Sequence, residues 1–134
     1  MALQYSTTVR NAQLDTIEST IGTAPILKIF AGSVPANCAA ADPATTLATL
    51  TLPSDWMAAA SSGSKAKSGT WSANAGATGT AGCWRIYDSS GVTCHMQGTC
   101  TASGGGGDMI LDSTSLTSGQ PFVVQTFAIS AANS

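Results

Sequence analysis

The chain has few charged residues. Asp, Glu, Lys and Arg make up 9% of its 134 residues, against roughly 25% in a typical soluble domain. The five basic residues are scattered and form no stripe that would neutralise phosphates, so we expect no nucleic-acid partner. Ser, Thr, Ala and Gly replace the missing charges, and hydroxyls are far cheaper to desolvate than ions. The composition therefore fits equally a Ser/Thr-coated soluble domain and a subunit of an assembly.

Long apolar runs are also missing. No segment approaches the length that spans a bilayer, so we expect no membrane partner. Residues 1–13 lack both the basic and the apolar region of a signal peptide. We therefore expect synthesis in the cytosol, where cysteines are more often thiols or ligands than disulfides. That expectation changes if the protein later leaves the cell by another route.

One helix is expected near the N-terminus. Leu14, Ile17 and Ile21 recur at helical spacing, which predicts a helix over residues 6–21 with one modest apolar face. Gly22 fits the residue just past its end. This apolar face has to lie against the chain's own sheet or against a neighbouring subunit.

The rest of the chain shows the pattern of a β-domain. Short alternating runs separated by turn signals predict a mainly β, antiparallel sandwich or jelly roll over residues 25–134, with residues 1–24 as an N-terminal helical arm. Lys65 and Lys67 indicate a solvated strand edge, and the glycine run at 104–107 indicates a mobile loop. Strands are expected near residues 26–30, 46–52, 65–73, 79–88, 92–100, 108–112 and 121–130.

Residues 77–100 read as a β-hairpin that holds three of the four cysteines and the only histidine. The turn Asp88-Ser89-Ser90-Gly91 suits a three-residue loop, which would pair Ile86 with Cys94. One face would then be apolar and the other mixed polar, as a single register requires. The apolar face would carry Trp84, Ile86, Cys94 and Met96, and the polar face Cys83, Arg85, Tyr87, His95 and Gln97.

This register constrains the four cysteines. Cys83 and Cys94 would point to opposite faces, which disfavours a bridge between them. Cys94 and Cys100 would lie about 20 Å apart along one strand, too far to bond. Cys38, on a long loop, can reach one of the three. We therefore expect at least one cysteine that is free or bonded to another subunit, and all four are candidate crosslinks.

No catalytic, cofactor or metal site is predicted. The cysteines lack CxxC spacing, and Cys94 and His95 would point to opposite faces, so zinc ligands do not converge. Cys83 and His95 would share a face but are not directly opposed, and no oxyanion-hole motif accompanies them. The larger apolar side chains are expected in the core or at an interface, and only secondarily as a platform for sugars. The candidate interface residues are Leu14, Ile17, Ile21, Trp56, Trp71 and Tyr87.

Several segments carry a resemblance to known proteins. They are GATGTAGCWRIYDSSG at residues 76–91, QGT shortly after it, and GGDMILDSTSLTSGQPFVVQTFAIS at residues 106–130; PANCAAADPATTLATLTLPSDWMAA and KAKSGTW extend them. Together they resemble a group of small virion proteins of tailed bacteriophages over most of residues 1–131. The resemblance implies a β-sandwich that decorates or cements a capsid, or belongs to the tail, and it implies no catalytic residue.

The resulting expectation is a non-enzymatic capsid decoration (cement) protein. Its partners would be the major capsid protein and copies of itself, as a trimer at quasi-threefold positions in the virion. It would assemble in the host cytoplasm, and its cysteines would crosslink subunits after release. Residues 1–21 would form an arm that reaches neighbours. The alternatives are a tail tube, tip or fibre protein and, from another class, a host-surface or carbohydrate-binding module that uses the aromatic side chains.

Overall fold

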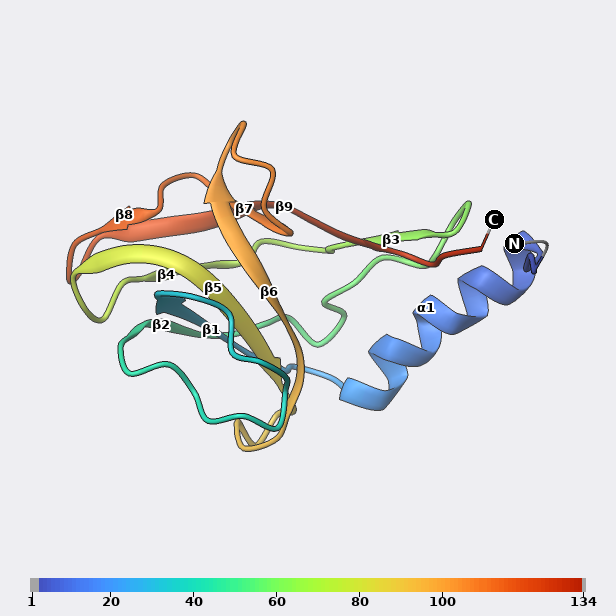
Figure 1. Cartoon of the computed structure of the whole chain (residues 1–134), viewed down its shortest axis with the longest axis horizontal. Coiled ribbons are helices and arrows are strands. Elements are labelled where there is room, and N and C mark those ends of the chain that lie inside the picture. The colour runs from blue at the N-terminus through green and yellow to red at the C-terminus, as the bar shows by residue number, and fades with distance from the viewer. Residues whose placement is uncertain (1–2, 134) are drawn as a thin grey trace.

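The computed structural model describes residues 3–133. It is mainly β with a single N-terminal helix, which confirms the predicted fold class (Figure 1). In the described part of the chain, no helix is long and apolar enough to cross a membrane. The elements are α1 (Thr7–Ile21), β1 (Ile26–Ala31), β2 (Thr46–Thr51), β3 (Ser64–Ala66), β4 (Ser72–Asn74), β5 (Gly79–Tyr87), β6 (Cys94–Ala102), β7 (Met109–Leu111), β8 (Ser115–Leu116) and β9 (Pro121–Ser130).

The strands form one strongly curled sheet with a sandwich-like shape. Its order is β2-β1-β5-β6-β7-β9-β3, with β4 paired to β9 and β8 paired to β5. All these pairs are antiparallel except β6 with β7, which are parallel, so the expectation of a purely antiparallel sheet is wrong at that place. Helix α1 lies outside the curl, alongside β3 and the end of β9 (Figure 1).

Helix α1 begins and ends where the sequence predicts. The hydroxyl of Ser6 accepts a hydrogen bond from the backbone N–H of Val9, as a serine N-cap does. Gly22 follows the helix with a φ of 94°, and its N–H donates to the carbonyl of Glu18. The predicted apolar stripe is only partly covered, because Leu14 and Ile21 are buried while Ile17 is exposed.

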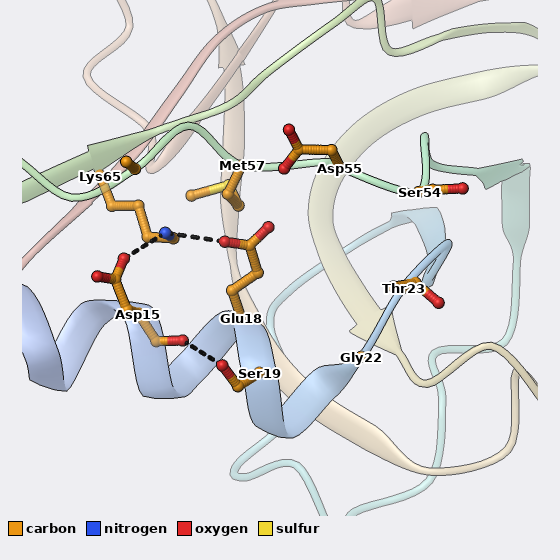
Figure 2. Close-up of a pocket in the computed structure, with 10 residues that line it drawn as sticks. Asp15, Glu18, Ser19, Gly22, Thr23, Ser54, Asp55, Met57 and Lys65 are labelled. Atoms are coloured by element: carbon orange, nitrogen blue, oxygen red, sulfur yellow. Dashed lines mark hydrogen bonds and ion pairs between the residues drawn. The ribbon is translucent and has the colours of Figure 1, made fainter.

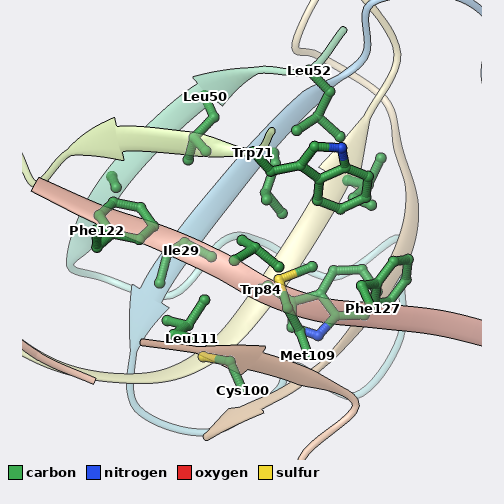
Figure 3. Close-up of a cluster of buried hydrophobic side chains, with 14 of the residues drawn as sticks. Ile29, Leu50, Leu52, Trp71, Trp84, Cys100, Met109, Leu111, Phe122 and Phe127 are labelled. Carbon is green, nitrogen blue, oxygen red and sulfur yellow. The ribbon is translucent and has the colours of Figure 1, made fainter. Parts of the chain in front are cut away.

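A cluster of aromatic side chains fills the inside of the curl (Figure 3). The ring of Phe127 lies 5.6 Å from Trp71 and 5.1 Å from Trp84, the second pair meeting edge to face. Trp56 extends the cluster at 6.1 Å from Trp71. Tilted and edge-on rings are the arrangements that aromatic pairs favour. Each indole N–H donates to a backbone carbonyl, the acceptors being Gly22, Ser68 and Thr99.

The register of the β5–β6 hairpin differs from the predicted one by two residues. Ile86 pairs with Met96 rather than with Cys94. The turn is longer than expected because the Asp88 N–H donates to the carbonyl of Thr93, which places a six-residue reversal where a three-residue loop was predicted. A shift of two residues leaves the alternation of faces intact, so Trp84 and Ile86 still point into the core.

A β-bulge in the same hairpin changes the position of one cysteine. The bulge between Ile86 and Tyr87 aligns Tyr87 with Cys94. Cys94 consequently packs with Cys83 and Tyr87 on the outer face, not with Trp84 in the core. The prediction that Cys83 and Cys94 lie on opposite faces is therefore wrong.

Two further segments differ from expectation. The strand predicted over residues 65–73 is divided into β3 and β4, both paired with β9. The glycine run at 104–107 folds against Thr101, whose hydroxyl accepts a hydrogen bond from Gly107 at 2.9 Å. A Cβ at Gly105 would lie 2.6 Å from the Thr101 side chain. The loop leads the chain back along the end of β6, so that β7 starts opposite Cys100 and runs parallel to β6.

A close backbone approach at Gly82 gives the first prediction. A Cβ at this position of β5 would lie 2.2 Å from the carbonyl oxygen of Gly32, a backbone atom that has little room to move. We expect Gly82→Ala to lower the free energy of unfolding by about 3 kcal/mol, the upper end for overpacking, in urea denaturation.

The matched control is Gly76→Ala, whose Cβ would meet only the Leu47 carbonyl oxygen at 3.8 Å. We expect this variant to change the free energy of unfolding by less than about 0.5 kcal/mol. Equal losses in the two alanine variants would contradict the steric argument.

Candidate functional site

The outer face of β1 and β5 is covered by residues 32–45, here called the cover loop, which joins β1 to β2 (Figure 1). Phe30, Cys83 and Tyr87 form a second apolar cluster on this face, and all three are buried. Arg85 lies beside them and is only 1% exposed. The polar face expected from the hairpin pattern is thus an internal layer, because the cover loop shields it from water.

All five N–H donors of Arg85 are satisfied, and four of them hold the cover loop in place. Nε donates to the side-chain oxygen of Gln97 at 3.1 Å, and Nη1 donates to Asp42 at 2.6 Å. The other donors reach backbone carbonyls of the loop at 3.0–3.1 Å. Those carbonyls belong to Asn37, Cys38 and Ala40. A buried guanidinium with every donor satisfied fixes one conformation of the segment it binds.

Asp42 completes this arrangement as the counter-charge. Its carboxylate accepts hydrogen bonds from Arg85 and from the hydroxyl of Tyr87. Burial acts to raise the pKa of Asp42, but the bonds from Tyr87 and Arg85 outweigh it and hold that pKa below its ordinary value. Burial, then the bond to Asp42, raises the pKa of Tyr87. At neutral pH the group is therefore an ion pair with a neutral phenol, which stabilises structure rather than exchanging protons.

Two of the four candidate crosslink cysteines are inaccessible. The thiol of Cys83 donates to the carbonyl of Ser33 in the cover loop, and burial raises its pKa. Cys100 lies in the core, where burial raises its pKa to about 12. Neither sulfur reaches the surface, so Cys83 and Cys100 are not available to bond a neighbouring subunit.

The other two cysteines lie together under the edge of the cover loop. Cys38 and Cys94 are half-buried and line the same small pocket. The Cys94 thiol donates to the carbonyl of Met96 at 3.5 Å, and the closest approach between two cysteines in the structure is 3.7 Å. From the sequence, Cys38 could be placed on a loop long enough to reach the hairpin. The β-bulge that turns Cys94 outward could not be predicted, because no residue pattern in the sequence indicates it.

The residues considered for metal binding or thiol catalysis do not converge. His95 is exposed and lies near the end of α1, in a pocket with Thr16 and Ile21. Cys83 is bonded to the cover loop, so these two side chains form no Cys–His pair. Over residues 3–133, no three His, Cys, Asp or Glu side chains gather in a group that would hold a metal ion.

A pocket of about 730 Å³ lies between α1 and the start of β3 (Figure 2). Lys65 reaches into it and is 2% exposed, so the predicted solvated strand edge is wrong for this residue. Its ammonium contacts Asp15 at 2.7 Å and Glu18 at 2.8 Å. Burial acts to lower the pKa of Lys65, but the hydrogen bonds to Asp15 and Glu18 outweigh it and raise that pKa. The amine stays protonated, so it serves as an ionic link and not as a nucleophile.

The candidate interface residues are mostly internal. Ile17 is the exception, because 36% of its surface is accessible. The indole and phenol rings are buried, so they offer no platform on which a sugar would stack, and the carbohydrate-binding alternative loses the residues it depended on. The five side chains that lie inside the fold, against the interface prediction, are Leu14, Ile21, Trp56, Trp71 and Tyr87.

The second prediction concerns Arg85. Replacement by Met leaves three loop carbonyls without donors, whereas Asp42 keeps the Tyr87 hydroxyl and reaches water, and we expect the free energy of unfolding to fall by about 2–3 kcal/mol. Arg85→Lys should lie between this variant and the wild type, because an ammonium has three donors and no planar fork. Urea denaturation would measure the series. Lys28→Met removes a nearby cation that only faces the Tyr87 ring, at 4.7 Å, and should cost about 1 kcal/mol or less.

The third prediction concerns the Lys65 pocket. Asp15→Asn combined with Glu18→Gln leaves a buried ammonium without a counter-charge, whereas Lys65→Met leaves two carboxylates that still reach water. We therefore expect the double variant to lower the urea midpoint more than Lys65→Met does. Hydrogen exchange should show the loss of protection in α1 first. The opposite order of stabilities would contradict the account of Lys65 as a buried, ion-paired link.

Comparison with known proteins does not add to this description. Neither protein-family models, nor curated proteins, nor solved structures gave a match to the chain.

Proposed function

We propose that this protein is a structural component of a tailed-phage virion, and specifically a capsid decoration protein that binds the assembled shell and stabilises it. The proposal combines the resemblance of residues 76–91 and 106–130 to small phage virion proteins with one property of the fold. The main supporting observation is that nearly all charged side chains have partners within the chain.

All five basic side chains have partners within the chain. Lys65 and Arg85 form ion pairs, and Arg10 donates to the carbonyl of Ala131. Lys28 and Lys67 lie over aromatic rings at 4.7 and 5.9 Å. Six of the seven carboxylates also have partners within the chain, the six being Asp15, Glu18, Asp42, Asp88, Asp108 and Asp112.

The consequence is an outer surface dominated by small neutral residues. Much of the exposed chain is Ser, Thr, Ala and Gly, and covering such a surface with another protein removes few ions from water. A decoration protein has this requirement, because it must seat on a preformed shell over a broad area. A mainly β body whose loop and helix are fastened from within adds the rigidity that such seating needs.

In this proposal, helix α1 differs from the free arm that was expected from the sequence. It is fastened to the body through Arg10, which donates to Ala131, and through Asn11, which accepts a hydrogen bond from the N–H of Gly63. The helix is therefore held against the body of the protein and is not a free arm. Its outward surface is here called the ledge. Its outward apolar residues, Val9 and Ile17, are exposed. We assign to this ledge the contact with the major capsid protein or with a second copy in a trimer.

The fourth prediction tests the location and the stabilising role together. Particles assembled without this chain should release DNA at a lower temperature than complete particles, and adding the purified chain should restore the difference. Cryo-electron microscopy should show the added density repeating with the capsid lattice. Density on the tail alone would favour a tail-associated protein, and failure to bind any particle would overturn the proposal.

A matched pair of variants separates the ledge from the rest of the surface. Val9→Ser with Ile17→Ser should keep the fold but weaken binding to stripped particles. Val92→Ser alters an exposed apolar residue of the hairpin turn, which is not part of α1, and should bind as the wild type does. Equal binding by all three proteins would exclude the ledge as the contact surface while leaving the decoration role open to the imaging test.

A further inference from the structure

Two of the four free cysteines meet at the edge of the cover loop. Cys38 and Cys94 line one pocket, and the closest two cysteines in the structure are 3.7 Å apart. A disulfide needs an S–S separation of about 2.05 Å. A small movement of one loop side chain therefore covers the remaining distance.

The backbone on either side of this pair is held in place. Arg85 donates to the carbonyl of Cys38 at 3.1 Å and to the carbonyl of Asn37 at 3.0 Å. On the other side, Cys94 is the first residue of β6 and pairs with Tyr87 across the β-bulge. The two thiols are thus positioned before any bond forms, by contacts that do not involve the sulfurs.

We propose that Cys38 and Cys94 are a modification site, at which oxidation forms a disulfide within the chain that locks the cover loop onto the sheet. This goes beyond the structural role proposed above and does not depend on it, because the isolated chain carries both sulfurs. It also replaces the expectation of bonds between subunits with one inside the subunit.

The oxidant is a small-molecule disulfide such as oxidised glutathione. Burial raises the pKa of Cys94 and so disfavours its thiolate, and we assign the first attack to Cys38 on the loop. Its thiolate attacks one sulfur of the oxidant, breaks the S–S bond and releases one reduced glutathione. The Cys94 thiolate then attacks the Cys38 sulfur of the mixed disulfide and releases the second. Two thiol protons and two electrons pass to one oxidised glutathione.

Burial restricts the reaction to this pair. The Cys83 thiol is buried beneath the cover loop and donates a hydrogen bond to the carbonyl of Ser33, and Cys100 lies in the core. Neither sulfur is exposed to a dissolved oxidant. Selectivity among four thiols therefore comes from the fold, and unfolding should abolish it.

The fifth prediction is tested by mapping the bond in the wild-type chain. The folded protein is equilibrated with oxidised glutathione, and its free thiols are blocked in denaturant. Trypsin and cyanogen bromide then place the four cysteines in four separate peptides, because cleavage occurs after Lys28, Met57, Lys67, Arg85, Met96 and Met109. We expect residues 29–57 joined to residues 86–96, a monomer lighter by two hydrogen atoms, and only the other two cysteines blocked.

Stability gives a second readout. The oxidised protein should unfold at a higher urea concentration than the reduced protein, with a gain of about a hundredfold or more in the folding equilibrium constant for a loop of this length. Cys38→Ser should abolish this difference. Cys83→Ala leaves the pair intact and should keep it, which makes it the matched control.

Other outcomes would overturn the inference. A disulfide-linked dimer, separate glutathione adducts on Cys38 and Cys94, or bridges that include Cys83 or Cys100 would each contradict it. The same treatment of urea-unfolded protein should give mixed pairings. If it gave the single 29–57 to 86–96 product, the fold would not be what selects the pair.

Discussion

The Arg85 guanidinium is the interaction on which the outer half of the molecule depends. A fourteen-residue connection without regular structure has no ladder of its own to satisfy its backbone carbonyls, and water is excluded where it lies on the sheet. Arg85 supplies three of these carbonyls with donors and pairs its charge with Asp42 from the same loop. One side chain thereby turns a polar strand face into a second buried layer, and the burial of Phe30, Cys83 and Tyr87 follows from it.

Lys65 holds helix α1 as Arg85 holds the cover loop. It rises from the short strand β3 into the gap beneath α1 and receives carboxylates from two successive turns of the helix. The helix has only a narrow apolar face, and Leu14 and Ile21 alone would leave its orientation loosely defined. Two buried cations thus fasten the two segments that the sheet itself does not contain. Few charges are then needed outside, which is how a chain with 9% charged residues can still be well organised.

The parts of this structure that follow from the sequence are those with a local cause. The cap at Ser6, the stop at Gly22 and the inward direction of Trp84 and Ile86 are determined by neighbouring residues, and they were predictable. The position of Cys94 was not, because a β-bulge between Ile86 and Tyr87 moves it to the other face without changing any sequence period. The burial of Lys65 and Arg85 depends on partners 43 to 50 positions away, and a lysine within a Ser/Gly segment looks the same whether it faces water or a helix.

The cover loop links the Arg85 ion pair to the two half-buried cysteines. Its conformation is set by a cation from the sheet, and the same bonds that satisfy its carbonyls place Cys38 against Cys94. In a reducing cytosol the arrangement is held by hydrogen bonds and one ion pair, which are reversible and allow the loop to fold and refold. In an oxidising medium the same geometry favours a covalent bond after only a small movement of one loop side chain. Under the proposed virion role, the chain would assemble in the first medium and work in the second, and it would gain stability at that step because Arg85 has already positioned the thiols.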